Sequence, residues 1–198
     1  MGLDKSKVAW LVPGIMVLSS VLIGFGGDSA RAALRYDRVW LGQGELWRMV
    51  SGHFAHLSWS HLLLNSAGLA LVWFLVGRTY TASSWLLIVV CSLVTIDLAF
   101  WFMHPELYWY VGMSGLLHGL LMAAIVGRWR WRPMDSETLV LLLLVVAKIS
   151  WEQFAGPVPG SAATAGGPVV VNAHLYGAVG GILGALLIKI RVRTPAAI

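Results

Sequence analysis

Three short segments of this chain place polar side chains inside otherwise apolar sequence. They are Gly112–Gly115 around Ser114, His61–Asn65, and Asn172–Gly177 around His174. A serine hydroxyl attacks a carbonyl when a base within hydrogen-bond reach accepts its proton and nearby donors stabilise the oxyanion that forms. We therefore predict that Ser114 is a nucleophile for acyl transfer and that His174 is its base.

The second segment supplies hydrogen-bond donors for this chemistry. His61 and Asn65 are four residues apart, so they share one face of a helix. The backbone N–H groups of Met113 and Ser114 add two more donors, because the first N–H groups of a helix lack acceptors within it. We expect these four groups to stabilise the oxyanion.

Glycines at four-residue spacing accompany the serine and the histidine. One pair is Gly115 and Gly119, and the other is Gly177 and Gly181. Small residues at this spacing let two membrane helices approach closely. We expect the two helices to pack through these glycines, which brings the nucleophile to its base.

The sequence provides no obvious acidic partner for the histidine. No Asp or Glu occurs after Glu152, so we predict a Ser-His dyad in place of the usual Ser-His-Asp triad. Packing against an aromatic ring such as Tyr108, Trp109 or Tyr110 is expected to orient His174.

Other ionisable residues in apolar segments have simpler interpretations. His118 is a rival base four residues after Ser114, but a packing or water-binding role is expected for it. Lys148 and Glu152 are also four apart and are expected to neutralise each other; the functional alternative is that they recognise substrate between the second and fifth helices. Asp97 is expected to be protonated or bonded across helices.

Metal and cofactor chemistry have little support in the sequence. The spacing of His53, His56 and His61 matches no strong metal motif, and the single cysteine, Cys91, excludes an internal disulfide. The sequence lacks the paired histidines at matching depths that a haem site would need, and it lacks the inverted repeat that is typical of transporters. We predict no metal and no organic cofactor.

Composition indicates that the bilayer is the solvent of this chain. Of its 198 residues 58% are hydrophobic and 12% are charged, and the mean hydropathy is +0.77. Apolar windows near the roughly 20 residues of a membrane span predict an all-α, six-helix membrane protein with one domain over residues 1–198. The predicted helices are residues 9–25, 61–77, 84–103, 112–127, 138–154 and 169–190.

Basic residues between these windows predict the orientation and exclude a nucleic-acid surface. Positive charge is retained in the cytoplasm, so both termini should be cytoplasmic and the polar site should open on the other side. The basic residues used are Lys5, Lys7, Arg78, Arg128, Arg130, Arg132, Lys189, Arg191 and Arg193. Four arginines within residues 26–60 oppose this rule, so we expect a structured, partly embedded loop there.

Together, these motifs resemble the rhomboid family of intramembrane serine proteases. The family patterns HxxxN, GxSG and AHxxGxxxG match His61 with Asn65, the glycines around Ser114, and Ala173-His174 with its two following glycines. Trp47-Arg48 and His56 resemble further family elements. The resemblance implies a six-helix rhomboid-like bundle and an endopeptidase that cuts membrane-anchored proteins near the boundary of the bilayer.

The segments Ser114–Gly119 and Trp151–Gln153 are more similar to the rhombosortase branch. That resemblance implies a bacterial inner-membrane enzyme whose substrates are single-pass proteins with a carboxy-terminal Gly-Gly sorting helix and a basic tail, cut on the periplasmic side. An amine could replace water as the final nucleophile. The alternative function is a catalytically silent rhomboid-like protein that binds membrane clients.

Overall fold

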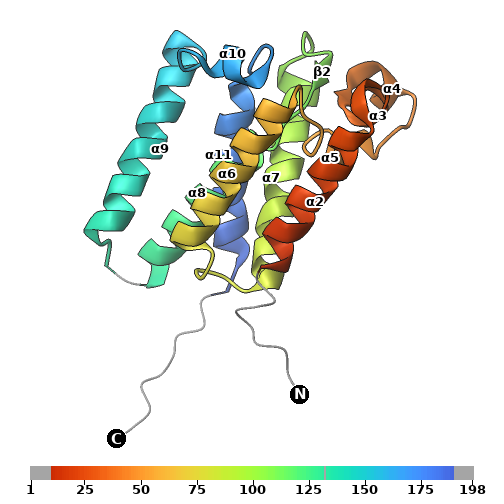
Figure 1. Ribbon diagram of the computed structural model, residues 1–198. Helices are drawn as coiled ribbons and strands as arrows, with labels where there is room; N and C mark the ends of the chain where they lie inside the picture. Colours follow the sequence, from red (N-terminus) through yellow and green to blue (C-terminus); the bar gives the residue numbers. More distant parts are fainter. Residues whose placement is uncertain (1–9, 132, 190–198) are drawn as a thin grey trace, which may run out of the picture.

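The computed structural model describes residues 10–131 and 133–189, and long helices dominate them (Figure 1). Each of the six predicted ranges overlaps one of these helices, although the ends differ by a few residues and Ala9 and Ile190 lie outside the described residues. The long helices are α2 (Leu11–Phe25), α6 (Trp59–Val76), α7 (Ala82–Met103), α8 (Ser114–Trp131), α9 (Ser136–Ala155) and α11 (Asn172–Leu187).

Short elements gather at one end of the bundle, at the top of Figure 1. They are α3 (Gly27–Leu34), β1 (Tyr36–Asp37), α4 (Arg38–Gly42), α5 (Arg48–Ser51), β2 (Trp109–Tyr110) and α10 (Ser161–Ala165). The two strands pair antiparallel, with Tyr36 opposite Tyr110. At this same end α6 and α11 begin and α9 ends, so it collects the terminal residues of several long helices.

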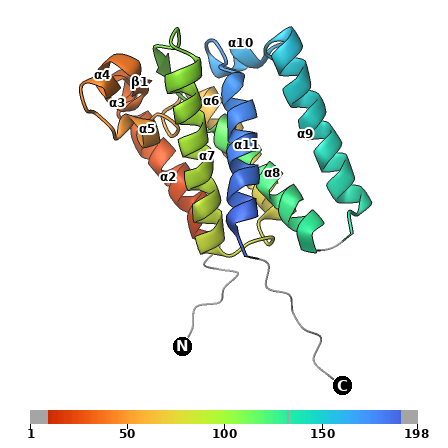
Figure 2. The same ribbon diagram turned by 180° about the vertical axis from the view of Figure 1, so that it is seen from behind.

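The core lies where α11 packs between α7 and α8 (Figure 2). Trp85, Ile88 and Ile96 of α7 are completely buried there, as is Leu116 of α8. Close backbone packing of this kind needs small side chains on α11, and its sequence supplies a run of glycines and alanines.

Glycines form the contact between α8 and α11. A Cβ added at Gly177 would overlap the carbonyl oxygen of Gly115, and one added at Gly181 would overlap that of Gly119. Neither position therefore tolerates a larger residue without separating the helices. The structure thus places the two predicted glycine pairs against each other.

Helix α9 is attached more loosely than the other long helices. Among the described residues it packs on α8 and, over a smaller area, on α11. Val145 and Ile149 join a small cluster with Met122 and Ala178. Most other apolar side chains of α9 point outward, and Phe154 is 93% exposed, so this helix presents a broad apolar face.

Three described helices, α6, α7 and α9, are long and apolar enough to cross a membrane. Helices α2 and α11 are apolar but have only 15 and 16 residues. Helix α8 has 18 residues and carries Arg128 and Arg130 in its last turn. The helical class is confirmed, whereas six membrane crossings and a single domain over the whole chain remain predictions.

The loop before α6 is folded, and its arginines are bound. Arg38 donates to the backbone carbonyl of Phe100 at 3.1 Å, and Arg48 donates to two carbonyls of its own loop. Arg31 and Arg35 pair with nearby carboxylates. These bonds explain why four arginines occur in a segment where the charge rule does not predict them.

Basic residues also fasten helix ends at the opposite end of the bundle. Arg128 donates to the carbonyl of Leu75 at 2.6 Å, near the last turn of α6. Arg130 donates to the carbonyl of Ile188 at 3.2 Å, just after α11. Five basic residues used to predict orientation lie outside the described residues: Lys5, Lys7, Arg132, Arg191 and Arg193.

Candidate active site

Ser114 and His174 meet at the interface of α8 and α11. Ser114 is the first residue of α8, and its Oγ lies 2.8 Å from Nε2 of His174, near the start of α11. The His174 side chain is buried, with only 4% of the residue exposed. The distance is that of a good hydrogen bond from a hydroxyl to an imidazole nitrogen.

The turn before Ser114 requires glycine. Gly112 has a φ of +128°, a conformation that residues with a side chain rarely adopt. Its carbonyl accepts a 2.6 Å hydrogen bond from the hydroxyl of Tyr110, and its N–H donates to the carbonyl of Gly52 at 3.2 Å. These two bonds fix the backbone from which the serine projects.

The second ring nitrogen of His174 has an acidic partner. Nδ1 of His174 lies 2.7 Å from Oε2 of Glu152, near the end of α9. The other oxygen of Glu152, Oε1, accepts a 2.8 Å bond from Nζ of Lys148. The expectation that His174 lacks a carboxylate was therefore wrong, because the partner lies 22 residues earlier in the chain on a helix that ends beside the start of α11.

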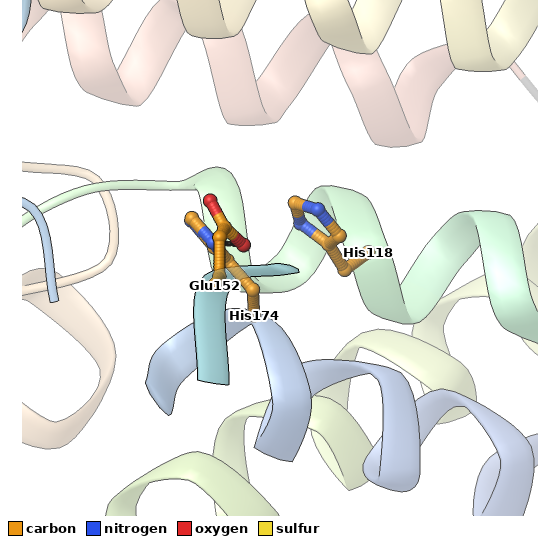
Figure 3. Close-up of side chains that lie close together, drawn as sticks. All are labelled: His118, Glu152 and His174. Atoms are coloured by element: carbon orange, nitrogen blue, oxygen red, sulfur yellow. Dashed lines mark hydrogen bonds and ion pairs between the residues drawn. The ribbon is translucent and has the colours of Figure 1, made fainter. Parts of the chain in front are cut away.

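The ring that covers His174 belongs to His118. The two ring centroids are 4.3 Å apart and the planes differ by 21°, a stacked arrangement, and Figure 3 shows both rings beside Glu152. The expected aromatic neighbours were wrong: Tyr110 packs on His53 and Phe100.

His118 is bound to the backbone of the nucleophile residue. Its Nδ1 lies 2.7 Å from the carbonyl oxygen of Ser114, so Nδ1 carries a proton and donates to it. The hydroxyl of Ser114 contacts the ring of His174, and the ring of His118 stacks on the ring of His174.

His118, Glu152 and His174 are also close enough to be tested as a metal site, with one ligand atom of each within 4.8 Å of the others. Zinc needs nitrogen ligands at about 2.0–2.1 Å that converge on one point. The stacked imidazole rings instead direct their nitrogens in nearly parallel planes. Both nitrogens of His174 already have protein partners, so the cluster fits a hydrogen-bond network better than a metal.

The earlier histidines contact other side chains of the protein. Nε2 of His53 lies 3.2 Å from Oδ1 of Asp97, and both side chains are buried. The partner of Asp97 thus comes from the folded loop. His56 meets the ring of His61 edge to face, with centroids 4.9 Å apart.

His56 is a neutral packing group beside His61. Burial lowers the pKa of His56 to about 4, and repulsion from the His61 ring contributes to the lowering. At neutral pH its Nδ1 donates to the carbonyl of Phe54 at 3.0 Å. The uncharged ring then supports one side of His61.

His61 faces the serine turn from α6, and Asn65 lies one turn further along the same helix. A Cβ added at Gly112 would lie 3.3 Å from Nε2 of His61. The N–H of Leu57 donates to Nδ1 of His61 at 3.4 Å, so the proton of this ring sits on Nε2, which can donate. Nδ2 of Asn65 is buried without a hydrogen-bond partner among the described residues.

The sequence analysis named Lys148 and Glu152 but missed the contact of Glu152 with His174. Lys148 and Glu152 form a charged pair within the apolar helix α9, and ionisable groups in such helices generally mark a functional site. Mutual neutralisation uses one oxygen of the carboxylate and leaves the second free for another donor. Spacing along the chain could not identify that donor as His174.

Known proteins are similar to this chain over most of its length. The family model described as the Rhomboid domain matches residues 43–191, which is more than half of the chain. The chain is 26% identical to the Rhomboid protease GluP of Bacillus subtilis (strain 168) over 98% of its own length. It spans only 36% of that relative. The chain belongs to the rhomboid family.

Proposed function

We propose that this protein is an intramembrane serine endopeptidase, with Ser114 as nucleophile and His174 as general base. The observation that carries the proposal is the 2.8 Å contact between Ser114 Oγ and His174 Nε2. A serine becomes an effective nucleophile when a base is held within this reach. The family match and the similarity to a protein described as a rhomboid protease support the same reaction class.

The proposed reaction gives each of these groups a role. Ser114 Oγ attacks the scissile carbonyl while its proton passes to Nε2 of His174. Asn65, His61 and the backbone N–H groups of Met113 and Ser114 donate to the oxyanion. Protonated His174 gives its proton to the leaving amine as the C–N bond breaks. Water then hydrolyses the acyl-serine ester, and an amine acceptor in place of water would give transpeptidation.

The loosely attached α9 suits lateral access of a substrate helix. Its larger contacts among the described residues are with α8 and α11, so we propose that substrate passes between α6 and α9 toward Ser114. A substrate helix must unwind to expose a carbonyl. Glycine favours this step, because each one lowers helix stability by about 1 kcal/mol relative to alanine.

The substrates that we propose are single-pass proteins with a carboxy-terminal Gly-Gly sorting helix followed by basic residues. The support is the similarity of Ser114–Gly119 and Trp151–Gln153 to the rhombosortase branch. The same similarity and the positive-inside rule support a bacterial inner membrane, cytoplasmic termini and a site that opens to the periplasm.

The test is cleavage of a reporter with such a tail in membranes that contain the native protein, Ser114→Ala or His174→Ala. Both variants should lose detectable cleavage while Ser83→Ala, an exposed serine of α7, cuts normally. Undiminished cleavage by Ser114→Ala would refute the proposal. A reporter with Gly-Gly replaced by Leu-Leu tests the substrate class separately and should be cut more slowly.

The alternative of a catalytically silent client-binding protein makes the opposite prediction. It expects no cleavage of the Gly-Gly reporter or of generic membrane substrates by the native protein. The hydrogen-bonded serine and histidine count against this alternative, because binding alone does not need them.

A further inference from the structure

Three charged or ionisable side chains form a continuous chain behind the nucleophile. Lys148 Nζ contacts Glu152 Oε1 at 2.8 Å, and Glu152 Oε2 contacts His174 Nδ1 at 2.7 Å. Glu152 is only 3% exposed. The reaction described above uses Ser114 and His174 but assigns no task to the lysine or the glutamate.

We propose that Glu152 is a positioning residue that holds His174 in its base-competent form, so that the site is a Ser-His-Glu triad. Lys148 in turn balances the charge of Glu152. This inference rests on the proposed function, because it assumes that His174 accepts the proton of Ser114.

The argument begins with the tautomers of imidazole. A neutral imidazole carries one proton, on either Nδ1 or Nε2. His174 can accept from Ser114 only when Nε2 is bare, so the proton must sit on Nδ1. A proton on Nδ1 needs an acceptor, and the carboxylate of Glu152 lies at hydrogen-bond distance.

Because of Lys148, the tautomer of His174 with its proton on Nδ1 needs the carboxylate. Lys148 Nζ lies 3.3 Å from Nδ1 of His174, and an ammonium group can only donate. Without the carboxylate, Lys148 would donate to Nδ1 and the ring proton would move to Nε2, toward Ser114. That tautomer cannot act as the base. Glu152 prevents it by accepting from both neighbours.

The contacts from Lys148 through Glu152 to His174 also balance charge during the reaction. When His174 accepts the serine proton it becomes a cation, and Glu152 provides the adjacent anion. A buried carboxylate is costly unless it is paired. Lys148 lies one turn away on α9, with 38% of its side chain exposed. Its ammonium group offsets this cost before substrate arrives.

Two other roles for Glu152 predict different behaviour. If it recognised substrate, its loss would mainly raise KM. If it only tied α9 to α11, its loss would lower stability and the amount of folded protein. A positioning role lowers kcat in the folded protein and makes the loss depend on Lys148.

The experiment measures kcat and KM for the Gly-Gly reporter in proteoliposomes containing the full chain, normalised to the folded, monodisperse fraction. The variants are Glu152→Gln, Glu152→Asp, Lys148→Met and the double variant Glu152→Gln with Lys148→Met. Glu152→Gln should reduce kcat by about 100-fold or more with a small change in KM. Glu152→Asp should retain part of the activity, since it keeps the acceptor.

The double variant is the decisive arm. Removing the ammonium group from the Glu152→Gln protein should restore kcat about 10-fold relative to the single variant. The ammonium group then no longer donates to Nδ1, and the introduced amide can turn its oxygen toward His174 to accept the Nδ1 proton. The matched control is Glu137→Gln at the start of α9, an exposed glutamate paired with Arg128, which should cut like the native protein.

The outcomes separate this inference from the proposed function. Cleavage by Ser114→Ala would reject the function itself. If Ser114→Ala is inactive but Glu152→Gln keeps native kcat, only the triad is rejected. A double variant no faster than Glu152→Gln rejects the competition with Lys148, and a Glu152→Gln protein that changes only KM assigns the residue to substrate recognition.

Discussion

The side-chain nitrogen of Asn65 is a buried polar atom that no contact among the described residues explains. Nδ2 of Asn65 finds no acceptor among the described residues, although the residue is only 5% exposed. An unpaired buried donor costs about 1–3 kcal/mol. The oxyanion proposal explains why the chain retains it, because the acceptor would form only during the reaction.

Replacing Asn65 therefore tests the oxyanion role. We expect Asn65→Ala to lower kcat by about 10²–10³-fold with little change in KM, because one donor to the oxyanion is lost. The control is Ser66→Ala on the same helix, because the Ser66 hydroxyl is also buried without a hydrogen-bond partner among the described residues. Equal kcat values for Asn65→Ala and the native protein, measured by initial rates of reporter cleavage, would exclude the role.

Residue types and spacing predicted which serine and histidine would meet, but they did not predict the carboxylate. Ser114 and His174 are recognisable because small residues surround each of them in helices that must approach closely. An acidic partner was expected only close to His174 along the chain, and Glu152 lies 22 residues before it. Its contact depends on how the end of α9 lies over α11, and no local pattern encodes that arrangement.

At the level of elements, the α8–α11 contact sets the geometry of the site. The backbone of Gly177 touches that of Gly115, directly after the nucleophile. Hydropathy predicted the helices, since apolar windows are long and clear, whereas the exact ends and the short elements α3, α4, α5 and α10 were not predicted. The short helices of the first loop depend on tertiary hydrogen bonds from arginines, and α10 accepts bonds from the hydroxyls of Ser58 and Ser60.

Gly177→Ala should disrupt this contact. The added methyl group meets backbone atoms that cannot rotate away, so we expect a loss of about 1–3 kcal/mol in stability and a large loss of cleavage. Gly14→Ala in α2 is the control, because nothing lies within 4 Å of its added Cβ. Thermal unfolding in detergent, followed by cleavage assays, measures both effects. If Gly177→Ala is as stable and as active as Gly14→Ala, the two helices have space for the added methyl group and the prediction is wrong.

At the level of the whole molecule, the two ends of the bundle are specialised. One end holds the paired strands and the short helices (Figures 1 and 2). The polar site lies near the start of α11, and the arginines that fasten α6 and α11 to α8 lie at the other end. This polarity supports the proposed orientation, with the site away from the cytoplasm. Charge along the sequence predicts the same orientation except in the folded loop, where hydrogen bonds hold the four arginines.

The most direct test of the central claim is the site and rate of covalent labelling by a fluorophosphonate, which reacts with an activated serine. Intact-mass and peptide analysis of the native protein should find one adduct, on Ser114, and His174→Ala should label at least about 100-fold more slowly because the base is gone. Labelling elsewhere, or at the same rate without His174, would contradict the account.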